Sequence, residues 1–548
     1  MKRRVRGFLL IIMLAGSITG VQAQGTVQEN SQLPPKEWFI LDPATDNVQG
    51  VSAEKAYNTI LKGKKSKTVT VAVIDSGVDI DHEDLQGKIW VNEKEIADNG
   101  IDDDKNGYID DKYGWNFIGG KDGRNVKQDT HELTRIYVKL KEKYGDIEPK
   151  KVRKKDREEY DYWVKVKEDF EKTYDEAHQQ YNFYSNLRDN IVRFHVLLKA
   201  YLGVEQISLD DLRGINSQDS IVLTARNIIG MIYQNVGEDA DFDKITEDLD
   251  GAVEHFSNQV NFAFNTEFNP RDIVGDNYED LYEKGYGNND VKGHDPSHGT
   301  HVAGIIAANR NNELGIKGIA DNVKIMVVRA VPDGDERDKD VANAIIYAVD
   351  NGAQIINMSF GKSYSPQKEA VDKAVKYAES KGVLLVHAAG NSSKDIDKGL
   401  NFPTKTYDNS KAKASNWLEV GASAWGTGSD FVGEFSNYGK ETVDIFAPGV
   451  DIYSTTPDNN YKSFDGTSMA APNTAGVAAL LMSYYPQLTA FQIKDIITKS
   501  SRKFDNLKVT KPGKEELVDF KDLSISGGLI NAYEALKMAE SMVMDKQN

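Results

Sequence analysis

The chain has 548 residues, of which 39% are hydrophobic and 28% charged, and its formal net charge is −18. This acidic balance argues against a protein that binds nucleic acid or an anionic membrane through basic surfaces. The sequence contains no cysteine, which excludes disulfides, a thiol nucleophile and a lipid-bearing cysteine.

The first residues, MKRRVRGFLLIIMLAGSITGVQAQ, combine a basic start, a short apolar stretch and small residues at a cleavage position. This pattern predicts a secretory signal peptide over residues 1–23, with an uncleaved N-terminal anchor as the alternative. Removing its four positive charges takes the net charge from −18 to −22. A loose segment is expected over 24–37. No long apolar stretch follows, so we expect an exported protein without a stable membrane span, in the periplasm or the extracellular space.

Two elements are predicted next. Residues 52–61 (SAEKAYNTIL) read as a short helix with Ser52 as its N-terminal cap. The run TVTVAVID, residues 68–75, is β-branched and apolar, which is typical of a strand buried on both faces of a parallel sheet.

An acidic loop, NGIDDDKNGYIDD, occupies residues 99–111. Its alternating oxygen-bearing residues and the following glycine resemble the first half of an EF-hand calcium loop. Position twelve is Tyr113 instead of glutamate, so Asp110 or Asp111 would have to complete the site. We predict a structural Ca²⁺ site, and the alternative is a solvated acidic turn. The predicted ligands are Asp102, Asp104, Asn106, Tyr108 and Asp110.

Residues 131–265 have few strand signals and many charges. Apolar residues recur there every seven positions: Trp163, Phe170, Ala177, Tyr184, Ile191 and Leu198, with a second series at Val166, Leu187, Phe194 and Tyr201. This heptad pattern predicts a long helix within 150–202 that packs against helices at 217–236 and 241–264. We expect a helical insertion over 131–265 that interrupts a domain made of 38–130 and 266–548. Its aromatic face is interpreted as packed core, and its role as a lid, substrate selector or dimer contact is a hypothesis.

From residue 298 onward, predicted strands and helices alternate. Strands are predicted at 323–329, 354–358, 383–388, 418–420 and 443–446, and helices at 298–308, 340–351, 366–381, 468–484, 490–499 and 532–542. Strands separated by helices of this length indicate parallel βαβ units. The sequence therefore predicts an α/β fold, a doubly wound and mostly parallel sheet with helices on both faces.

Three polar side chains stand where strands end or helices begin. Asp75 closes the strand VTVAVI, His298 opens the stretch HGTHVAGIIAA, and Ser468 opens SMAAPNTAGVAALL. In a parallel sheet such positions gather at one edge. An acid, an imidazole and a hydroxyl can form a nucleophilic triad, in which histidine removes the serine proton and the carboxylate orients the histidine. Taken singly, Asp75 and Ser468 have an ordinary interpretation as turn or cap residues.

A triad also needs donors for the oxyanion that forms on the substrate. The Ser468 amide lies at a predicted helix start, where N–H groups lack internal partners. Asn391 follows the buried run VLLVHAAG and can supply a second donor. The small residues after Ser468 allow its helix to lie close beneath the sheet.

The stretches AVIDSGVD, HGTHVAG, AAGN and GTSMAAP, in this order, resemble the subtilisin-like serine proteases, the subtilases of peptidase family S8. The resemblance covers roughly 38–125 and 276–542 and leaves out the helical insertion. It implies the subtilisin-like fold and peptide bond hydrolysis through an acyl-enzyme by Asp75, His298, Ser468 and Asn391. It also implies a substrate-binding edge and a facing wall of the primary specificity pocket. The edge consists of Ser359, Phe360 and Gly361, and the wall of Ala388, Ala389 and Gly390.

Some features depart from that family's pattern. Ala471 and Asn473 stand where many relatives have Ser or Thr and His. The residues between the predicted signal and Trp38 are too few for the folding pro-domain that many secreted relatives carry. We expect a secreted serine endopeptidase acting on protein or peptide substrates. The alternative is a catalytically idle scaffold or adhesive protein that acts through its helical insertion. Cleavage specificity, physiological substrate and oligomeric state are left open.

Overall fold

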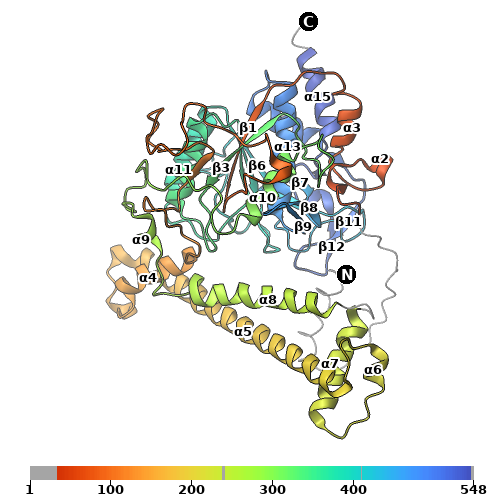
Figure 1. The fold of residues 1–548 in the computed structure, drawn as a ribbon. Coiled ribbons are helices and arrows are strands. Elements are labelled where there is room, and N and C mark those ends of the chain that lie inside the picture. The colour runs from red at the N-terminus through yellow and green to blue at the C-terminus, as the bar shows by residue number, and fades with distance from the viewer. Residues whose placement is uncertain (1–33, 237–240, 409, 545–548) are drawn as a thin grey trace. The chain divides into compact units, whose positions relative to one another are not determined.

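The computed structural model describes residues 34–236, 241–408 and 410–544. The predicted signal peptide (1–23) and most of the predicted loose segment (24–37) lie outside these residues. The described residues form two compact units (Figure 1): one consists of residues 34–136 and 267–544, and the other lies within Tyr137–Thr266. In the described part of the chain, no helix has both the length and the apolar character that crossing a membrane requires.

The first unit is built on a nine-stranded sheet with the order β10-β13-β7-β6-β5-β4-β1-β3-β2. Its strands are β1 (Val69–Asp75), β2 (Gly114–Asn116), β3 (Val323–Arg329), β4 (Ile355–Met358), β5 (Leu384–Ala388), β6 (Trp417–Ser423), β7 (Ile445–Pro448), β10 (Arg502–Lys503) and β13 (Gly528–Leu529). Neighbouring strands are parallel except β10 and β13, which are antiparallel. Two antiparallel pairs lie apart from this sheet, β8 (Ile452–Thr456) with β9 (Asn460–Phe464) and β11 (Lys508–Thr510) with β12 (Leu517–Asp519).

Helices cover both faces of the sheet because alternate strand residues point in opposite directions. The helices of this unit are α2 (Pro43–Asp46), α3 (Ala53–Asn58), α4 (Glu132–Tyr144, which continues into the second unit), α9 (Arg271–Val274), α10 (Ser297–Ala307), α11 (Asp338–Asp350), α12 (Lys368–Ser380), α13 (Thr467–Tyr484), α14 (Ala490–Lys499) and α15 (Ala532–Met544). In β1, Val71 and Val73 join a core shared with α10 and α13, whereas Ala72 and Ile74 join a core shared with α11 and α12. The predicted doubly wound α/β fold is confirmed.

Helix α13 runs through the core beneath the sheet and contacts β1, β4, β5, β6 and β7. From Thr467 to Ser483 all of its residues are buried except Ser468. Small residues make this approach possible: a Cβ on Gly476 would lie 2.8 Å from the Cβ of Ile319. The helix therefore leaves one hydroxyl, that of Ser468, half-buried at its first turn, while the residues up to Ser483 are buried.

The second unit is helical. It contains α5 (Arg157–Leu202), α6 (Leu209–Arg213), α7 (Ser220–Val236), α8 (Phe242–Asn258) and a π-helical turn, η5 (Gln259–Ala263). The 46-residue α5 packs against α7 and α8, as the heptad pattern predicts. All six residues of the first heptad series are buried. In the second series Val166 is buried, but Tyr201 is 48% exposed and stands outside the packed face.

The two connections to the helical insertion meet the first unit at the start of α11. Before the insertion, Asp129 accepts hydrogen bonds of 2.7 and 2.9 Å from the guanidinium of Arg337. After it, Arg271 donates bonds of 2.6 and 2.9 Å to Asp340. Arg337, the residue before α11, and Asp340 are only three positions apart, so both ends of the inserted segment are fixed to the start of α11.

Candidate active site

Asp75 and His298 meet at the carboxyl end of β1. Asp75 is the last residue of the strand and is 2% exposed, and His298 is the second residue of α10. The Nδ1 atom of His298 lies 2.8 and 3.0 Å from the two carboxylate oxygens of Asp75. A carboxylate accepts, so Nδ1 carries the hydrogen and Nε2 of the neutral ring has a free lone pair.

The glycine after His298 makes this contact possible. A Cβ on Gly299 would lie 2.1 Å from the carbonyl oxygen of Gly77 and 3.2 Å from the Cβ of Asp75. The start of α10 therefore touches the turn after β1. Any side chain at position 299 would push His298 away from Asp75.

Two opposing effects act on the imidazole of His298, whose side chain is 39% exposed. Burial lowers its pKa, because the charged ring is poorly solvated. The negative charge of Asp75 and its hydrogen bond raise the pKa by more, so the net shift is upward. The carboxylate thus stabilises the imidazolium that would form when His298 takes a proton.

Ser468 lies at the start of α13. Its Oγ donates a 3.0 Å hydrogen bond to the carbonyl oxygen of Ser359, and the Oγ of Ser359 donates a 2.9 Å bond to the carbonyl oxygen of Ser468. Among the described residues, no hydrogen bond joins Ser468 to His298. In unliganded sites such bonds are often long and tighten when substrate binds.

Two hydrogen-bond donors converge beside Ser468. The Oδ1 atom of Asn391 accepts bonds of 2.9 and 2.8 Å from the amide and hydroxyl of Thr467, which fixes the orientation of the side-chain amide. A Cβ built on Gly466 would lie 3.4 Å from Nδ2 of Asn391 and 3.5 Å from the backbone nitrogen of Ser468. Glycine leaves this space open. An oxygen there could accept from both groups, and the Ser468 amide has no preceding helical turn to bond with.

The predicted substrate-binding residues follow β4 and β5, which are neighbours in the sheet. Ser359, Phe360 and Gly361 continue from β4, and Ala388, Ala389 and Gly390 end β5 and follow it. Of these residues all except the two glycines are buried. The ring of Phe360 lies 6.3 Å from that of His387 within the core, so this segment offers a ligand its backbone.

Asn401 lies between these two segments and was missed in the sequence. Its Nδ2 donates a 3.1 Å bond to the carbonyl oxygen of Ala388. A Cβ on Gly361 would lie 2.8 Å from both atoms of the Asn401 amide, and one on Gly390 would lie 3.2 Å from its Cγ. No motif marks Asn401; the facing glycines were the only available signal.

His301, one turn after His298, has a supporting position. It is fully buried, stacks on Phe464, and its Nε2 lies 2.9 and 3.0 Å from the carbonyl oxygens of Ile452 and Lys462. Burial lowers its pKa to about 3, so the ring is neutral and its Nε2–H holds the β8–β9 hairpin against α10.

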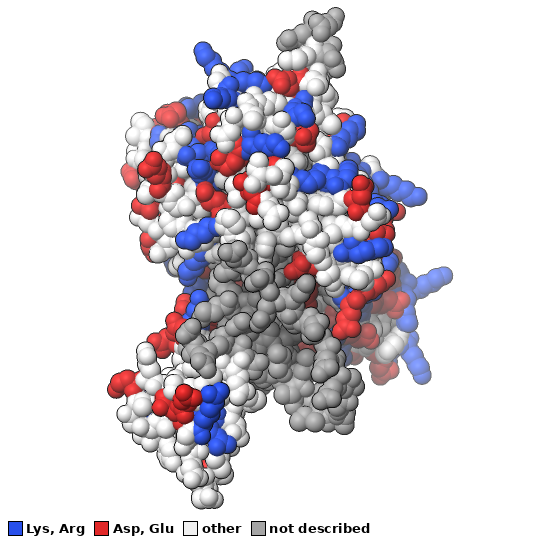
Figure 2. All heavy atoms as spheres, turned by 90° about the vertical axis from the view of Figure 1, so that its right-hand side faces the viewer, with Lys and Arg blue, Asp and Glu red and all other residues white. Residues whose placement is uncertain are grey.

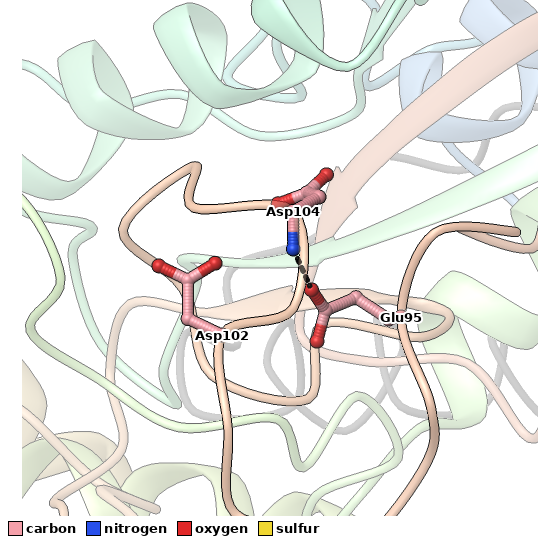
Figure 3. Close-up of side chains that lie close together, drawn as sticks. All are labelled: Glu95, Asp102 and Asp104. Carbon is pink, nitrogen blue, oxygen red and sulfur yellow. Dashed lines mark hydrogen bonds between the residues drawn. The ribbon is translucent and has the colours of Figure 1, made fainter.

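The acidic loop gathers three carboxylates, Glu95, Asp102 and Asp104, whose oxygens lie within 4.8 Å of one another (Figure 3). The amide of Asp104 donates a 3.0 Å bond to Glu95. Glu95 is 2% exposed and was not among the predicted ligands, because it precedes the EF-hand-like pattern.

The other predicted ligands serve the loop in different ways. Asn106 donates from Nδ2 to Asp111, and its Oδ1 accepts a 2.8 Å bond from the amide of Tyr108. The Tyr108 ring packs on Tyr347 in the core. Asp110 accepts bonds of 3.0 and 2.9 Å from the amides of Asn99 and Gly100, which close the loop. Burial raises the pKa of the neighbouring Asp111 to about 6.

Surface charges of both signs are mixed on the face that Figure 2 shows, where acidic and basic side chains stand side by side.

The family profile and the curated relatives support the resemblance to subtilases. The sequence profile of the subtilase family matches residues 66–521. The chain is 45% identical over 188 residues to the thermophilic serine proteinase of Bacillus sp. strain AK1, covering 34% of this chain and only 43% of that protein. It is 40% identical over 217 residues to thermitase of Thermoactinomyces vulgaris, covering 38% and 72%. A solved protease structure from Pseudoalteromonas arctica PAMC 21717 is 30% identical, covers 46% of this chain and 74% of that chain, and has a TM-score of 0.36.

Proposed function

Because this chain belongs to the subtilase family of serine peptidases, we propose that it is a secreted endopeptidase that hydrolyses peptide bonds in proteins. The observation that carries the proposal is the convergence of the Asn391 Nδ2 and the Ser468 amide on the space left open by Gly466. Two donors that face one empty point beside the half-buried Ser468 suit an oxyanion. Secretion is supported by the signal-like pattern of residues 1–23.

In the proposed mechanism, Ser468 turns its hydroxyl from the Ser359 carbonyl toward His298. The Nε2 of His298 takes the hydroxyl proton while Oγ bonds to the scissile carbonyl carbon, and the carbonyl oxygen becomes an oxyanion. Asn391 and the Ser468 amide donate to that oxyanion. Asp75 holds the protonated ring in place throughout.

The intermediate then collapses. The carbonyl re-forms, the C–N bond breaks, and His298 gives its proton to the leaving amine, which leaves an acyl group on Ser468. Water repeats the sequence: His298 takes its proton, its oxygen attacks the acyl carbon, and the proton returns to the Oγ of Ser468. The acid product leaves and the enzyme is restored.

Extended substrates would bind along 359–361 by adding a strand. This segment continues from β4 and begins at the residue that hydrogen-bonds Ser468, so a peptide paired there would carry its scissile bond to the nucleophile. The space between 359–361 and 388–390, with Asn401 beside it, would take the side chain before the cut.

A fluorophosphonate probe tests this assignment, because it reacts with activated serines irrespective of peptide sequence. The wild-type protein is expected to be labelled at Ser468, as read by mass spectrometry of the digested adduct. Prior denaturation should abolish the label, since the triad would be dispersed. An unlabelled native protein would reject the peptidase and favour an idle scaffold.

The pH dependence of kcat/KM is expected to report on His298. Only the neutral ring can accept the serine proton, and a raised pKa keeps the ring protonated to higher pH. Activity should therefore fall with decreasing pH through a midpoint above the ordinary histidine value of about 6.5. The measurement is kcat/KM against a chromogenic peptide at constant ionic strength.

The Asp75→Asn variant is the control for that profile. It removes the charge that raises the pKa of His298, so its acid midpoint should move down while kcat falls. If the wild type and Asp75→Asn had the same acid midpoint, the fall of kcat/KM at low pH would be due to a group other than His298.

Glu95, Asp102 and Asp104 would hold a structural calcium ion, with the loop oxygens of 102–111 completing the shell. Hard carboxylate oxygens at this spacing fit Ca²⁺, and the ion would neutralise charges that otherwise repel one another. It would supply no chemistry to the reaction; it would tie Glu95 to the loop.

Calorimetric titration with CaCl₂ is expected to give a binding heat in the wild type and none in Asp104→Ala. Ligand at about 100 times Kd adds about 2.7 kcal/mol to the unfolding free energy, so the wild-type Tm should also rise with calcium. Asp122→Ala, at an exposed aspartate outside the cluster, is the matched control. Equal heats in wild type and Asp104→Ala would exclude the site.

A further inference from the structure

Two anchors hold the segment 359–362, which contains the proposed substrate-binding edge. At one end, Ser359 and Ser468 exchange the reciprocal hydrogen bonds described above. At the other end, the amide of Lys362 donates a 3.0 Å bond to the carbonyl of Phe402, and the Phe402 amide donates a 2.8 Å bond to the carbonyl of Lys362. Between these anchors lies Gly361, which has no side chain to be held.

The Lys362 side chain is buried and all its donors are used. It is 2% exposed, and its Nζ lies 2.8 Å from Oε2 of Glu132, 2.8 Å from Oδ1 of Asp338 and 2.7 Å from the carbonyl oxygen of Glu336. An ammonium has three hydrogens, so these partners satisfy it completely. The side chain therefore has one defined position.

Glu132, the first residue of α4, is itself fixed. Its amide donates a 2.8 Å bond to Asp335, and its carboxylate accepts a 2.7 Å bond from Arg135 as well as the Lys362 bond. Burial by itself raises the pKa of this carboxyl. The positive charges of Lys362 and Arg135 lower it by more, so that the net pKa is about 2. Glu132 is thus a charged and rigid support.

These contacts suggest more than a contribution to stability. A buried ion pair often stabilises a fold no better than apolar side chains of the same size would. It does impose one geometry, and glycine has more backbone freedom than other residues, so the position of Gly361 depends on how its neighbours are held. The residue so held directly follows the backbone that a substrate would pair with.

We propose that Lys362 is a positioning residue of this peptidase, and that its buried contacts with Glu132 and Asp338 fix 359–361 in the register that extended substrates need. This inference rests on the proposed function. It predicts that the loss of activity caused by replacing Lys362 grows with the number of substrate residues that pair with that edge.

The test compares Lys362→Met with wild type on two substrates, a long chromogenic peptide and a single-residue acyl ester. KM for the long peptide is expected to rise on the order of tenfold, because strand pairing is weakened. For the short ester, kcat/KM should change by no more than about twofold, because the ester has no backbone to pair with the edge.

Lys339→Met is the matched control. Lys339 is also fully buried and lies 2.6 Å from Asp276 and 2.9 Å from Glu283, but it does not contact the edge. The Lys339→Met variant should lose stability but keep the wild-type ratio of kcat/KM for the long peptide to kcat/KM for the ester. Lys362→Met leaves the buried carboxylates of Glu132 and Asp338 without their lysine partner. If this variant does not fold, the double variant Lys362→Met/Glu132→Gln, which removes one of those two charges, replaces it in the test.

The outcomes are separable. If Lys362→Met lost the same factor in kcat/KM on both substrates, or if Lys339→Met changed the ratio of the two kcat/KM values equally, Lys362 would have only a structural role. Either result would overturn the inference. A wild-type protein that is neither active nor labelled by the fluorophosphonate overturns the proposed function, and the inference with it. A long-substrate defect confined to the Lys362 variants supports both.

Discussion

Replacing Ser468 by alanine is expected to lower kcat for peptide hydrolysis on the order of 10⁶-fold, the loss that removal of the triad serine causes in subtilisin, a family member. Without Oγ no acyl-enzyme can form, and His298 has no proton to take from the nucleophile. The oxyanion donors would remain, so a residual rate of about 10³ to about 10⁴ over water is expected. The measurement is kcat with a chromogenic peptide at substrate saturation.

The fold should tolerate this change. Ser468 loses one hydrogen bond, to the Ser359 carbonyl, and thermal unfolding should be nearly unchanged. Ser483→Ala is a matched control on the same helix: its buried hydroxyl donates a 2.7 Å bond to the carbonyl of Lys67, which precedes the start of β1, whereas Asp75 lies at the other end of that strand. It should keep full activity. If Ser468→Ala retained more than about one hundredth of the wild-type kcat, another nucleophile would have to be sought.

Replacing Asn391 by alanine is expected to lower kcat about 10²-fold to about 10³-fold with little change in KM, because its Nδ2 would act mainly on the oxyanion of the transition state. Asn391 also has a second role, since its Oδ1 accepts from Thr467 at the start of α13. The alanine variant removes both roles and cannot separate them.

Asn391→Asp separates them. Aspartate keeps an oxygen for Thr467 but has no donor and brings a negative charge beside the oxyanion. If donation to the oxyanion is the function, Asn391→Asp should be at least as inactive as Asn391→Ala. Recovery of kcat in the aspartate variant would mean that capping of α13 is what matters, and it would falsify the assigned role.

Much of the first unit could be predicted from local sequence. The run at 68–75 folds into β1 because β-branched residues suit a strand buried on both faces. The positions of His298 and Ser468 in the fold were predictable, because each stands in the first turn of a helix rich in small residues. The predicted helix at 490–499 has the observed bounds, where a Thr489 capping box marks its first turn.

What could not be predicted depends on contacts between distant segments. The hairpin of β8 and β9 carries little alternation, and its second strand is partly exposed; its place is set by His301. Glu95 reaches the acidic cluster only because the loop folds back. Lys362 is an ordinary surface-type residue in the sequence, and its burial depends on carboxylates more than 20 positions away. The heptad pattern wrongly included Tyr201 in the packed face; this residue lies in the final turn of α5 and is exposed.

The inserted segment is attached to the start of α11 through Asp129–Arg337 and Arg271–Asp340, and this bears on how such a chain can change during evolution. Because the two chain segments that lead into and out of the insertion are anchored close together, the insertion is equivalent to a closed loop on the first unit. The entropy of closing a loop grows only with the logarithm of its length. Each added residue of an insertion therefore costs the first unit less free energy than the one before it, so segments of very different length can join the same two points of that unit.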